Sequence, residues 1–142
     1  MPWPLQDVFI ERGEKFALKN IAYLLMTIAA FQRGKITPGK MFLENKAILV
    51  SPGGKILNVF HKNHPVPFVE RSVPGDGKIP AIATSYGIMS TSIYYDADMP
   101  WGMRNWHRTN LMCCYCLPVI SMTLHLITVI WPCFAALKMA AL

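Results

Sequence analysis

Cysteine is scarce in this sequence and confined to one end of it, because no cysteine precedes Cys113. The others are Cys114, Cys116 and Cys133. A disulfide framework needs cysteines distributed along the chain, so this distribution excludes one. A structural zinc site built on closely spaced cysteines needs a second pair of ligands, which the sequence does not supply. We therefore expect no metal ion and no organic cofactor.

Acidic residues are missing after Asp98, and basic residues are nowhere clustered. The net charge is +6, to which residues 101–142 contribute Arg104, Arg108 and Lys138. Nucleic-acid-binding domains gather Lys and Arg into a stripe interleaved with aromatic residues, and neither half of the chain has such a stripe. We therefore expect no nucleic-acid partner. A charged segment follows directly on the first residues, so the N-terminus does not resemble a secretory signal.

The 142 residues leave room for one domain, which need not be complete. Phe9–Gln32 is predicted to form a helix that either runs into a buried strand or ends as a buried helix, since polar positions almost vanish from Ala22 to Phe31. Periodicity alone does not separate a buried strand from a buried helix end there. The apolar residues near helical spacing in the first half of this segment are Phe9, Ile10, Phe16, Ala17 and Ile21.

A β-hairpin is predicted next, because Lys46–Val50 and Lys55–His61 flank the turn sequence Ser-Pro-Gly-Gly. The segment His64–Pro80 holds four prolines and two glycines and is predicted to be an irregular loop. Two further strands are expected at Ala81–Ala83 and Ile88–Tyr95. One helix followed by several short strands indicates an α/β fold.

Residues 101–142 differ in character from the rest, and we expect a domain boundary near residue 100. Leu111–Leu142 is almost wholly apolar, and it exceeds the ~20 residues that span a bilayer. A transmembrane helix, kinked at Pro118 and Pro132, is one interpretation of this segment. The chain is then either cytoplasmic or associated with a membrane through residues 111–142.

Three stretches of the chain, Glu44–Gly54, His61–Glu70 and Ser92–Pro100, together resemble motifs of the nitrilase superfamily of carbon–nitrogen hydrolases. Glu44–Gly54 (ENKAILVSPGG) resembles the strand and turn before the family's lysine, and His61–Glu70 (HKNHPVPFVE) resembles the lysine motif itself, most closely in apolipoprotein N-acyltransferase-like members. Ser92–Pro100 (SIYYDADMP) resembles the nucleophile motif I-C-Y-D-x-x-F-P. The resemblance covers roughly residues 9–100 and implies part of an α-β-β-α sandwich.

The resemblance also implies roles for three residues. In this family a cysteine attacks an amide carbon, a glutamate carries the proton and a buried lysine stabilises the oxyanion. Lys62 stands at the position of that lysine, and Glu70 at the position of the second acid that accompanies it. Tyr94 stands at the position of the cysteine. The ancestral substrate implied is an amide or an acyl donor.

Two departures argue against the usual chemistry. A phenol at position 94 stays protonated at neutral pH and is bulky, so it cannot replace a thiolate. Trp3-Pro4 is similar to the family's W-P-E, but Leu5 stands where the catalytic glutamate is expected. We therefore expect an inactive, truncated carbon–nitrogen hydrolase domain. An active amidase or N-acyltransferase, and a small protein anchored in a membrane, are the alternatives.

The last segment shows none of the family's later motifs in the frame given. Read in a shifted frame, codons for Met112–Cys116 encode Val-Leu-Leu-Leu, and those from Ile127 to Met139 permit the family's H-x-x-M-A-x-x-R-x-I-E-N-G. Out-of-register leucine codons also account for the clustered cysteines. We therefore expect residues 101–142 to be an apolar tail that is translated out of frame, and the coding nucleotide sequence tests this.

Overall fold

This computed structural model describes residues 3–31, 43–99, 112–116 and 127–130. The chain begins with helix α1 (Trp3–Asn20), which passes through a two-residue turn into strand β1 (Tyr23–Phe31). At the turn, Ala22 N–H donates to the carbonyl of Ala17 at 3.1 Å, and Ile21 takes a positive φ of 51°. Of the two alternatives for the apolar run after Ala22, the strand is the one observed, and the helix before it begins at Trp3 rather than at the predicted Phe9.

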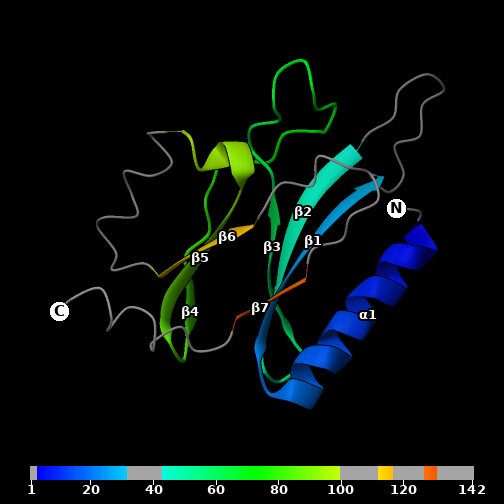
Figure 1. Cartoon of the computed structure of the whole chain (residues 1–142), viewed down its shortest axis with the longest axis vertical. Helices are drawn as coiled ribbons and strands as arrows, with labels where there is room; N and C mark the ends of the chain where they lie inside the picture. The colour runs from blue at the N-terminus through cyan, green and yellow to red at the C-terminus, as the bar shows by residue number, and fades with distance from the viewer. Residues whose placement is uncertain (1–2, 32–42, 100–111, 117–126, 131–142) are drawn as a thin grey trace.

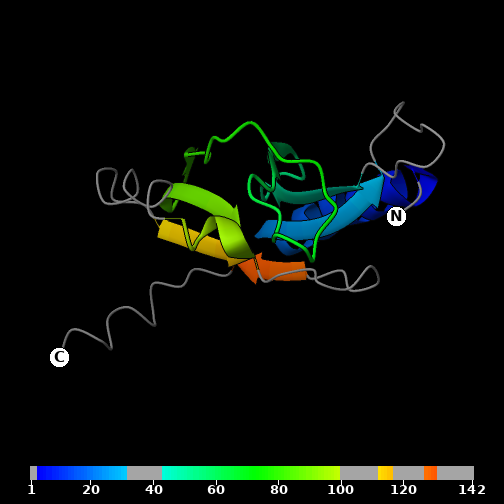
Figure 2. The same ribbon diagram turned by 90° about the horizontal axis from the view of Figure 1, so that it is seen from above.

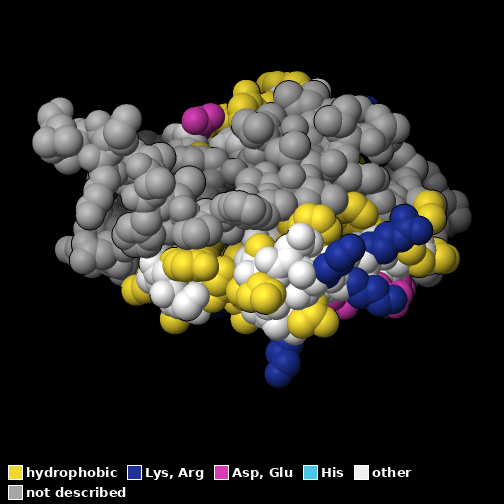
Figure 3. Space-filling model, turned by 60° about the horizontal axis from the view of Figure 1, so that its bottom comes forward, with side chains coloured by type: hydrophobic (Ala, Val, Ile, Leu, Met, Phe, Trp, Pro, Cys, Tyr) yellow, Lys and Arg dark blue, Asp and Glu magenta, His cyan; other side chains and the backbone are white. Residues whose placement is uncertain are grey.

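The face of helix α1 that packs on the sheet differs in part from the predicted apolar face. Phe16 and Ile21 are 44% and 78% exposed, whereas Gly13 and Ala17 are buried. A Cβ added at Gly13 would lie 2.1 Å from the sulfur of Met26, so the helix approaches β1 closely through its small residues. Phe16 therefore remains on the solvent side. Figure 3 shows hydrophobic side chains lying beside Lys and Arg on the lower face of the molecule.

The predicted hairpin is present. Strands β2 (Leu43–Val50) and β3 (Ile56–His61) pair in antiparallel fashion. The turn is closed by Ser51 N–H, which donates to Lys55 O at 2.8 Å, and by Gly54 N–H, which donates to Ser51 O at 2.9 Å. Gly54 has a φ of 73°, a conformation that glycine adopts without steric cost.

The strands form two sheets (Figure 1). The first has the order β3-β2-β1-β7, in which β7 (Ile127–Ile130) pairs antiparallel to β1. The second has the order β4-β5-β6 and comprises β4 (Ile82–Thr84), β5 (Gly87–Ile93) and β6 (Met112–Cys116). The pairing of β5 with β6 is parallel. The second predicted strand thus ends at Ile93 rather than Tyr95, because a 3₁₀ turn, η1 (Tyr94–Asp96), follows it.

The described elements form three layers, as Figure 2 shows from above. Alternate side chains of β1 face opposite ways, as in any strand. Leu24, Met26 and Ile28 of β1 pack under α1 together with Ile48 and Val50 of β2. Tyr23 and Leu25 of β1 lie between the sheets, in a cluster that also contains Leu49, Phe60 and Ile93. Among the described residues α1 is the only α-helix, so three layers of an α-β-β-α sandwich are visible.

Tyr23 ties the two sheets together at one end. Its ring meets that of Tyr86 edge-on, with centroids 5.6 Å apart. The phenol oxygen lies 3.3 Å from the Ser85 hydroxyl and accepts a hydrogen bond from Ser85 N–H at 3.1 Å. The hydrogen bond with the Ser85 side chain lowers the pKa of Tyr23 below its ordinary value.

Two short strands lie inside the apolar C-terminal segment. Met112–Cys116 and Ile127–Ile130 are strands that join different sheets, rather than parts of one continuous helix. None of the described helices is long and apolar enough to cross a membrane. The remainder of the predicted transmembrane segment, residues 117–126 and 131–142, lies outside the described part of the chain.

Leu49 is the residue whose truncation tests the core between the sheets. It is 1% exposed and lies in the cluster formed with Phe60 and Ile93. Leu49→Ala is expected to lower the free energy of unfolding by about 2–5 kcal/mol, because it removes buried methyl groups and leaves a cavity. Urea unfolding measures this. Leu57→Ala, on the same hairpin but 40% exposed, should cost about 1 kcal/mol or less, and equal losses would contradict this packing.

Candidate active site

Lys62 follows the last residue of β3 and is fully buried. Its backbone N–H donates to Asn45 O at 2.9 Å, which continues the β2–β3 ladder by one residue. The side chain has a relative exposure of 0%, and its Nζ lies 2.5 Å from Oε2 of Glu70. A buried ammonium group is stable only when it is paired, and Glu70 supplies the partner.

Glu70 comes from the loop that was predicted to be irregular, and a short turn places it. Glu70 N–H donates to Val66 O at 3.0 Å, and the Glu70 carboxylate accepts from Val66 N–H at 2.9 Å. The side chain is 10% exposed. Oε2 therefore receives both the Lys62 ammonium and a backbone N–H, and the loop that looked structureless builds one half of the site.

Tyr94 follows a strand of the second sheet, and its ring lies near the Lys62 ammonium group. It is the first residue of η1, directly after β5, and its φ is 40°. A positive φ is uncommon for a residue other than glycine and costs conformational free energy. The ring centroid lies 5.8 Å from Lys62 Nζ, and the residue is 45% exposed. The fold thus brings together all three residues that the sequence singled out.

Asp96 also belongs to this site, although the sequence analysis did not name it as a site residue. It is 1% exposed, and its carboxylate accepts hydrogen bonds from the backbone N–H groups of Asn63 and His64 at 3.1 and 2.7 Å. The signal that could have revealed it was its place in the SIYYDADMP motif, two residues after Tyr94.

Gly75 packs tightly against the backbone that carries Lys62. Its N–H donates to Lys62 O at 2.8 Å. A Cβ at this position would lie 2.5 Å from both His61 O and Asn63 Oδ1, so a side chain could not be added without moving the lysine segment. The 73–77 loop therefore fixes the backbone of residues 61–63, which carries Lys62.

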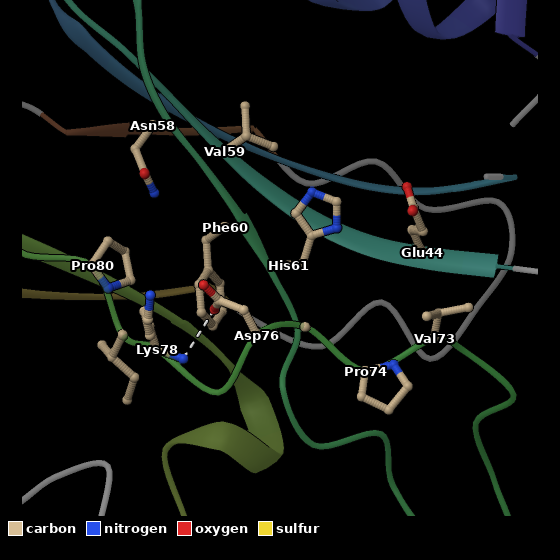
Figure 4. Close-up of a pocket in the computed structure, with 12 residues that line it drawn as sticks. Glu44, Asn58, Val59, Phe60, His61, Val73, Pro74, Asp76, Lys78 and Pro80 are labelled. Atoms are coloured by element: carbon tan, nitrogen blue, oxygen red, sulfur yellow. Dashed lines mark hydrogen bonds between the residues drawn. The ribbon is translucent and has the colours of Figure 1, made fainter. Parts of the chain in front are cut away.

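A pocket of about 690 Å³ lies beside the site but not in it. It lies at the free edge of β3 and the loop after Val73, where Asp76 accepts a hydrogen bond at 3.0 Å from Lys78 N–H of the same loop (Figure 4). Its lining residues are Glu44, Asn58, Val59, Phe60, His61, Val73, Pro74, Gly75, Asp76, Lys78, Ile79 and Pro80. Neither Lys62, Glu70 nor Tyr94 borders it.

Among the described side chains, the arrangement can stabilise negative charge through the Lys62 ammonium group. The Lys62 ammonium has three protons, of which Glu70 engages one, and it lies in a dry environment where a charge acts strongly. The group that faces it is a phenol. Over residues 3–31 and 43–99, no cluster of three or more His, Cys, Asp or Glu side chains could hold a metal ion.

Comparison with protein families gives a match to the carbon-nitrogen hydrolase model over residues 8–121. The chain belongs to this family. No match is found among curated proteins. The match includes α1 from residue 8 onward, the central strands of both sheets, and Lys62, Glu70, Tyr94 and Asp96, and it extends beyond residue 100. The predicted boundary at that residue stays a prediction.

Solved structures show the same fold. A cysteine-to-serine mutant of an amidase of the nitrilase superfamily from Nesterenkonia AN1 matches with a TM-score of 0.63 at 19% identity, over 78% of this chain and 42% of that one. A cysteine-to-alanine mutant of the same amidase in complex with butyramide matches with the same TM-score and identity, over 78% and 41%.

These findings confirm the superfamily and the α/β nitrilase-type fold. The carbon-nitrogen hydrolase chain described here spans about two fifths of the length of the amidase that it resembles. The closeness to N-acyltransferases, the loss of activity and the out-of-frame tail stay predictions.

Proposed function

We propose that this chain is a carbon–nitrogen hydrolase-type domain that keeps the lysine–glutamate half of an amide-processing site but does not hydrolyse amides. The observation that carries the proposal is Tyr94, which stands at the turn after β5 and presents its ring to Lys62 Nζ at 5.8 Å. A thiolate at this turn would lie beside the ammonium group that stabilises the oxyanion. A phenol cannot replace it, because a phenol is a much weaker nucleophile than a thiolate and its side chain is much bulkier than that of cysteine.

The second departure is the absence of the family's proton carrier from the position at which it is expected. Leu5 occupies that position, and it lies in the first turn of α1 with 57% of its surface exposed. The acid that does contact Lys62 is Glu70, which is already engaged by Lys62 and by Val66 N–H. Among the side chains that the structure describes, we therefore infer that this site has neither the family's nucleophile nor a free general base.

The ancestral chemistry that we propose is cysteine-dependent amide hydrolysis or acyl transfer. The Pro65–Glu70 segment (PVPFVE) favours N-acyltransferase-like ancestry. Several solved structures of the Nesterenkonia amidase carry adducts at its active-site cysteine, as with the acetamide moiety of fluoroacetamide. That cysteine chemistry has no counterpart at Tyr94.

Amide hydrolysis by the full chain tests the proposal. Ammonia release from butyramide should equal that of buffer, and Lys62→Ala should change nothing. Stopped assays with a coupled ammonia readout over hours would detect turnover far below the usual enzyme range of about 1–10³ s⁻¹. Turnover that is present in the natural chain and abolished by Lys62→Ala would overturn the proposal and favour an active amidase.

A second candidate, membrane association through residues 111–142, is supported by the apolar character of that segment. An apolar run of this length partitions into a bilayer when it is not buried in a fold. Its test is carbonate extraction of membranes from cells that express the full chain. Resistance that disappears on deletion of 111–142 would support the candidate, and recovery of the full chain in the aqueous fraction would refute it.

A further inference from the structure

The turn that carries Tyr94 is fastened by one buried carboxylate. Asp96, the last residue of η1, accepts three hydrogen bonds, all from the segment that follows Lys62. Oδ2 accepts from Asn63 N–H at 3.1 Å, and Oδ1 accepts from His64 N–H at 2.7 Å and contacts His64 Nδ1 at 2.9 Å. Two of the three partners are backbone groups, which cannot move away by a change of rotamer.

These hydrogen bonds join two segments that no ladder connects. Lys62 continues β3 in the first sheet, whereas Tyr94 and Asp96 follow β5 in the second. The partners are 32 and 33 residues apart in the chain. The relative position of the two segments, and hence of the Tyr94 ring and the Lys62 ammonium, thus depends on these hydrogen bonds and on side-chain packing such as that of Ile93 against Phe60, rather than on strand pairing.

Asn63 extends the network to a third segment. Its Oδ1 accepts from Gly77 N–H at 2.9 Å, and its Nδ2 donates to Lys78 O at 3.1 Å. Because Asn63 is itself held by Asp96, the turn, the lysine segment and the 73–78 loop form one connected unit.

We propose that Asp96 is the positioning residue of this site: it fastens the 94–96 turn to residues 63 and 64 and so holds the side chain at position 94 over Lys62. This inference deepens the proposed function and rests on it for the meaning of the site. It explains the residue type, since a carboxylate offers two oxygens that only accept, as donors on both sides of it require. An asparagine would turn an NH₂ group toward one of those donors.

Chemical labelling of Lys62 tests the proposal without any need for activity. Lys62 is fully buried, so an acylating reagent reaches it slowly, and peptide-resolved mass spectrometry measures its rate against exposed Lys55 in the same sample. Asp96→Asn should raise the Lys62 rate about tenfold or more, since charge-assisted bonds that close the site are lost. Tyr94→Ala provides the rate for a site without the covering ring.

Three controls separate positioning from general loss of stability. Asp98→Asn changes an exposed carboxylate in the same segment and should leave the Lys62 rate unchanged. Leu49→Ala destabilises the core without touching the site. When urea is used to bring Leu49→Ala and Asp96→Asn to the same free energy of unfolding, the Lys62 labelling rate should rise less in Leu49→Ala. The double variant Tyr94→Ala/Asp96→Asn should label much more slowly than the product of the two single increases predicts, because both changes open the same contact.

The outcomes are decisive in either direction. An unchanged Lys62 rate in Asp96→Asn, an equal rise in Leu49→Ala of matched stability, or multiplicative effects in the double variant would each overturn the proposal. If Asp96→Asn does not fold, His64→Ala removes one of the three bonds and should give a smaller rise at Lys62 alone, and its absence would count against the role. Failure of this test leaves the amide assay and its conclusion untouched.

Discussion

Lys62→Met is expected to lower the free energy of unfolding by about 3–5 kcal/mol, the range observed when one partner of a buried ion pair is removed. The Lys62 side chain is 0% exposed and that of Glu70 is 10% exposed, so the carboxylate would be left without its cation and almost without water. Urea unfolding followed by circular dichroism measures the loss. Lys55→Met, which removes an exposed cation from the same hairpin, should change stability by about 0.5 kcal/mol or less.

The double variant Lys62→Met/Glu70→Leu shows what the pair contributes. Replacing both partners of a buried pair by apolar groups is often neutral for stability or increases it. We therefore expect the double variant to recover most of the stability that Lys62→Met loses, although Val66 N–H loses its acceptor. A double variant as unstable as Lys62→Met, or a single variant as stable as the natural chain, would contradict a buried and mutually dependent pair.

Local pattern was sufficient to predict the β2–β3 hairpin, because the Ser-Pro-Gly-Gly turn and its flanking strands lie within a few neighbouring residues. The disappearance of polar positions after Ala22 indicated a buried element but did not decide between the strand β1 and a helix end. The orientation of α1 was partly wrong, since apolarity alone does not reveal that Gly13 is the residue closest to the sheet.

Pairings between distant segments could not be predicted in the same way. Strand β6 pairs with β5 along Met89–Ile93. The sequence of β6, Met112–Cys116, has neither the alternation of polar and apolar residues nor the turn residues from which a strand is predicted. Its apolar composition suits a helix or a strand equally well, and only the partner strand decides between them. The sequence pattern therefore indicates one continuous apolar segment over residues 111–142, whereas two short stretches of it belong to different sheets.

The site was predicted in part because its motifs encode residue types but not contacts. Lys62, Glu70 and Tyr94 were named from motif positions, and the structure brings them together. The motif I-C-Y-D-x-x-F-P includes an acid at position 96, but it does not show that this carboxylate accepts hydrogen bonds from the backbone N–H groups of Asn63 and His64. Those contacts need the two sheets to be placed together.

Tyr94→Cys is expected to create an unusually acidic thiol. The new side chain would stand at the turn after β5, beside the buried Lys62 ammonium, and a neighbouring cation lowers the pKa of a thiol from about 8.5 to about 7.5 or below. Its alkylation by iodoacetamide, followed as a function of pH by peptide-resolved mass spectrometry, gives this pKa directly. Peptide resolution separates it from the four natural cysteines.

Two matched variants show that the cause is the site. Asp98→Cys places a thiol at an exposed position of the same segment and should titrate near pH 8.5. Tyr94→Cys in the Lys62→Met/Glu70→Leu background removes the cation without leaving an unpaired carboxylate, and it should return the thiol to the same value.

The alkylation profile of Tyr94→Cys is thus the most direct test of the claim that Tyr94 stands at the position of the nucleophilic cysteine in a carbon–nitrogen hydrolase site. The account predicts a midpoint at or below about pH 7.5 that depends on Lys62. A midpoint equal to that of Asp98→Cys, with no change when the ion pair is removed, would contradict it.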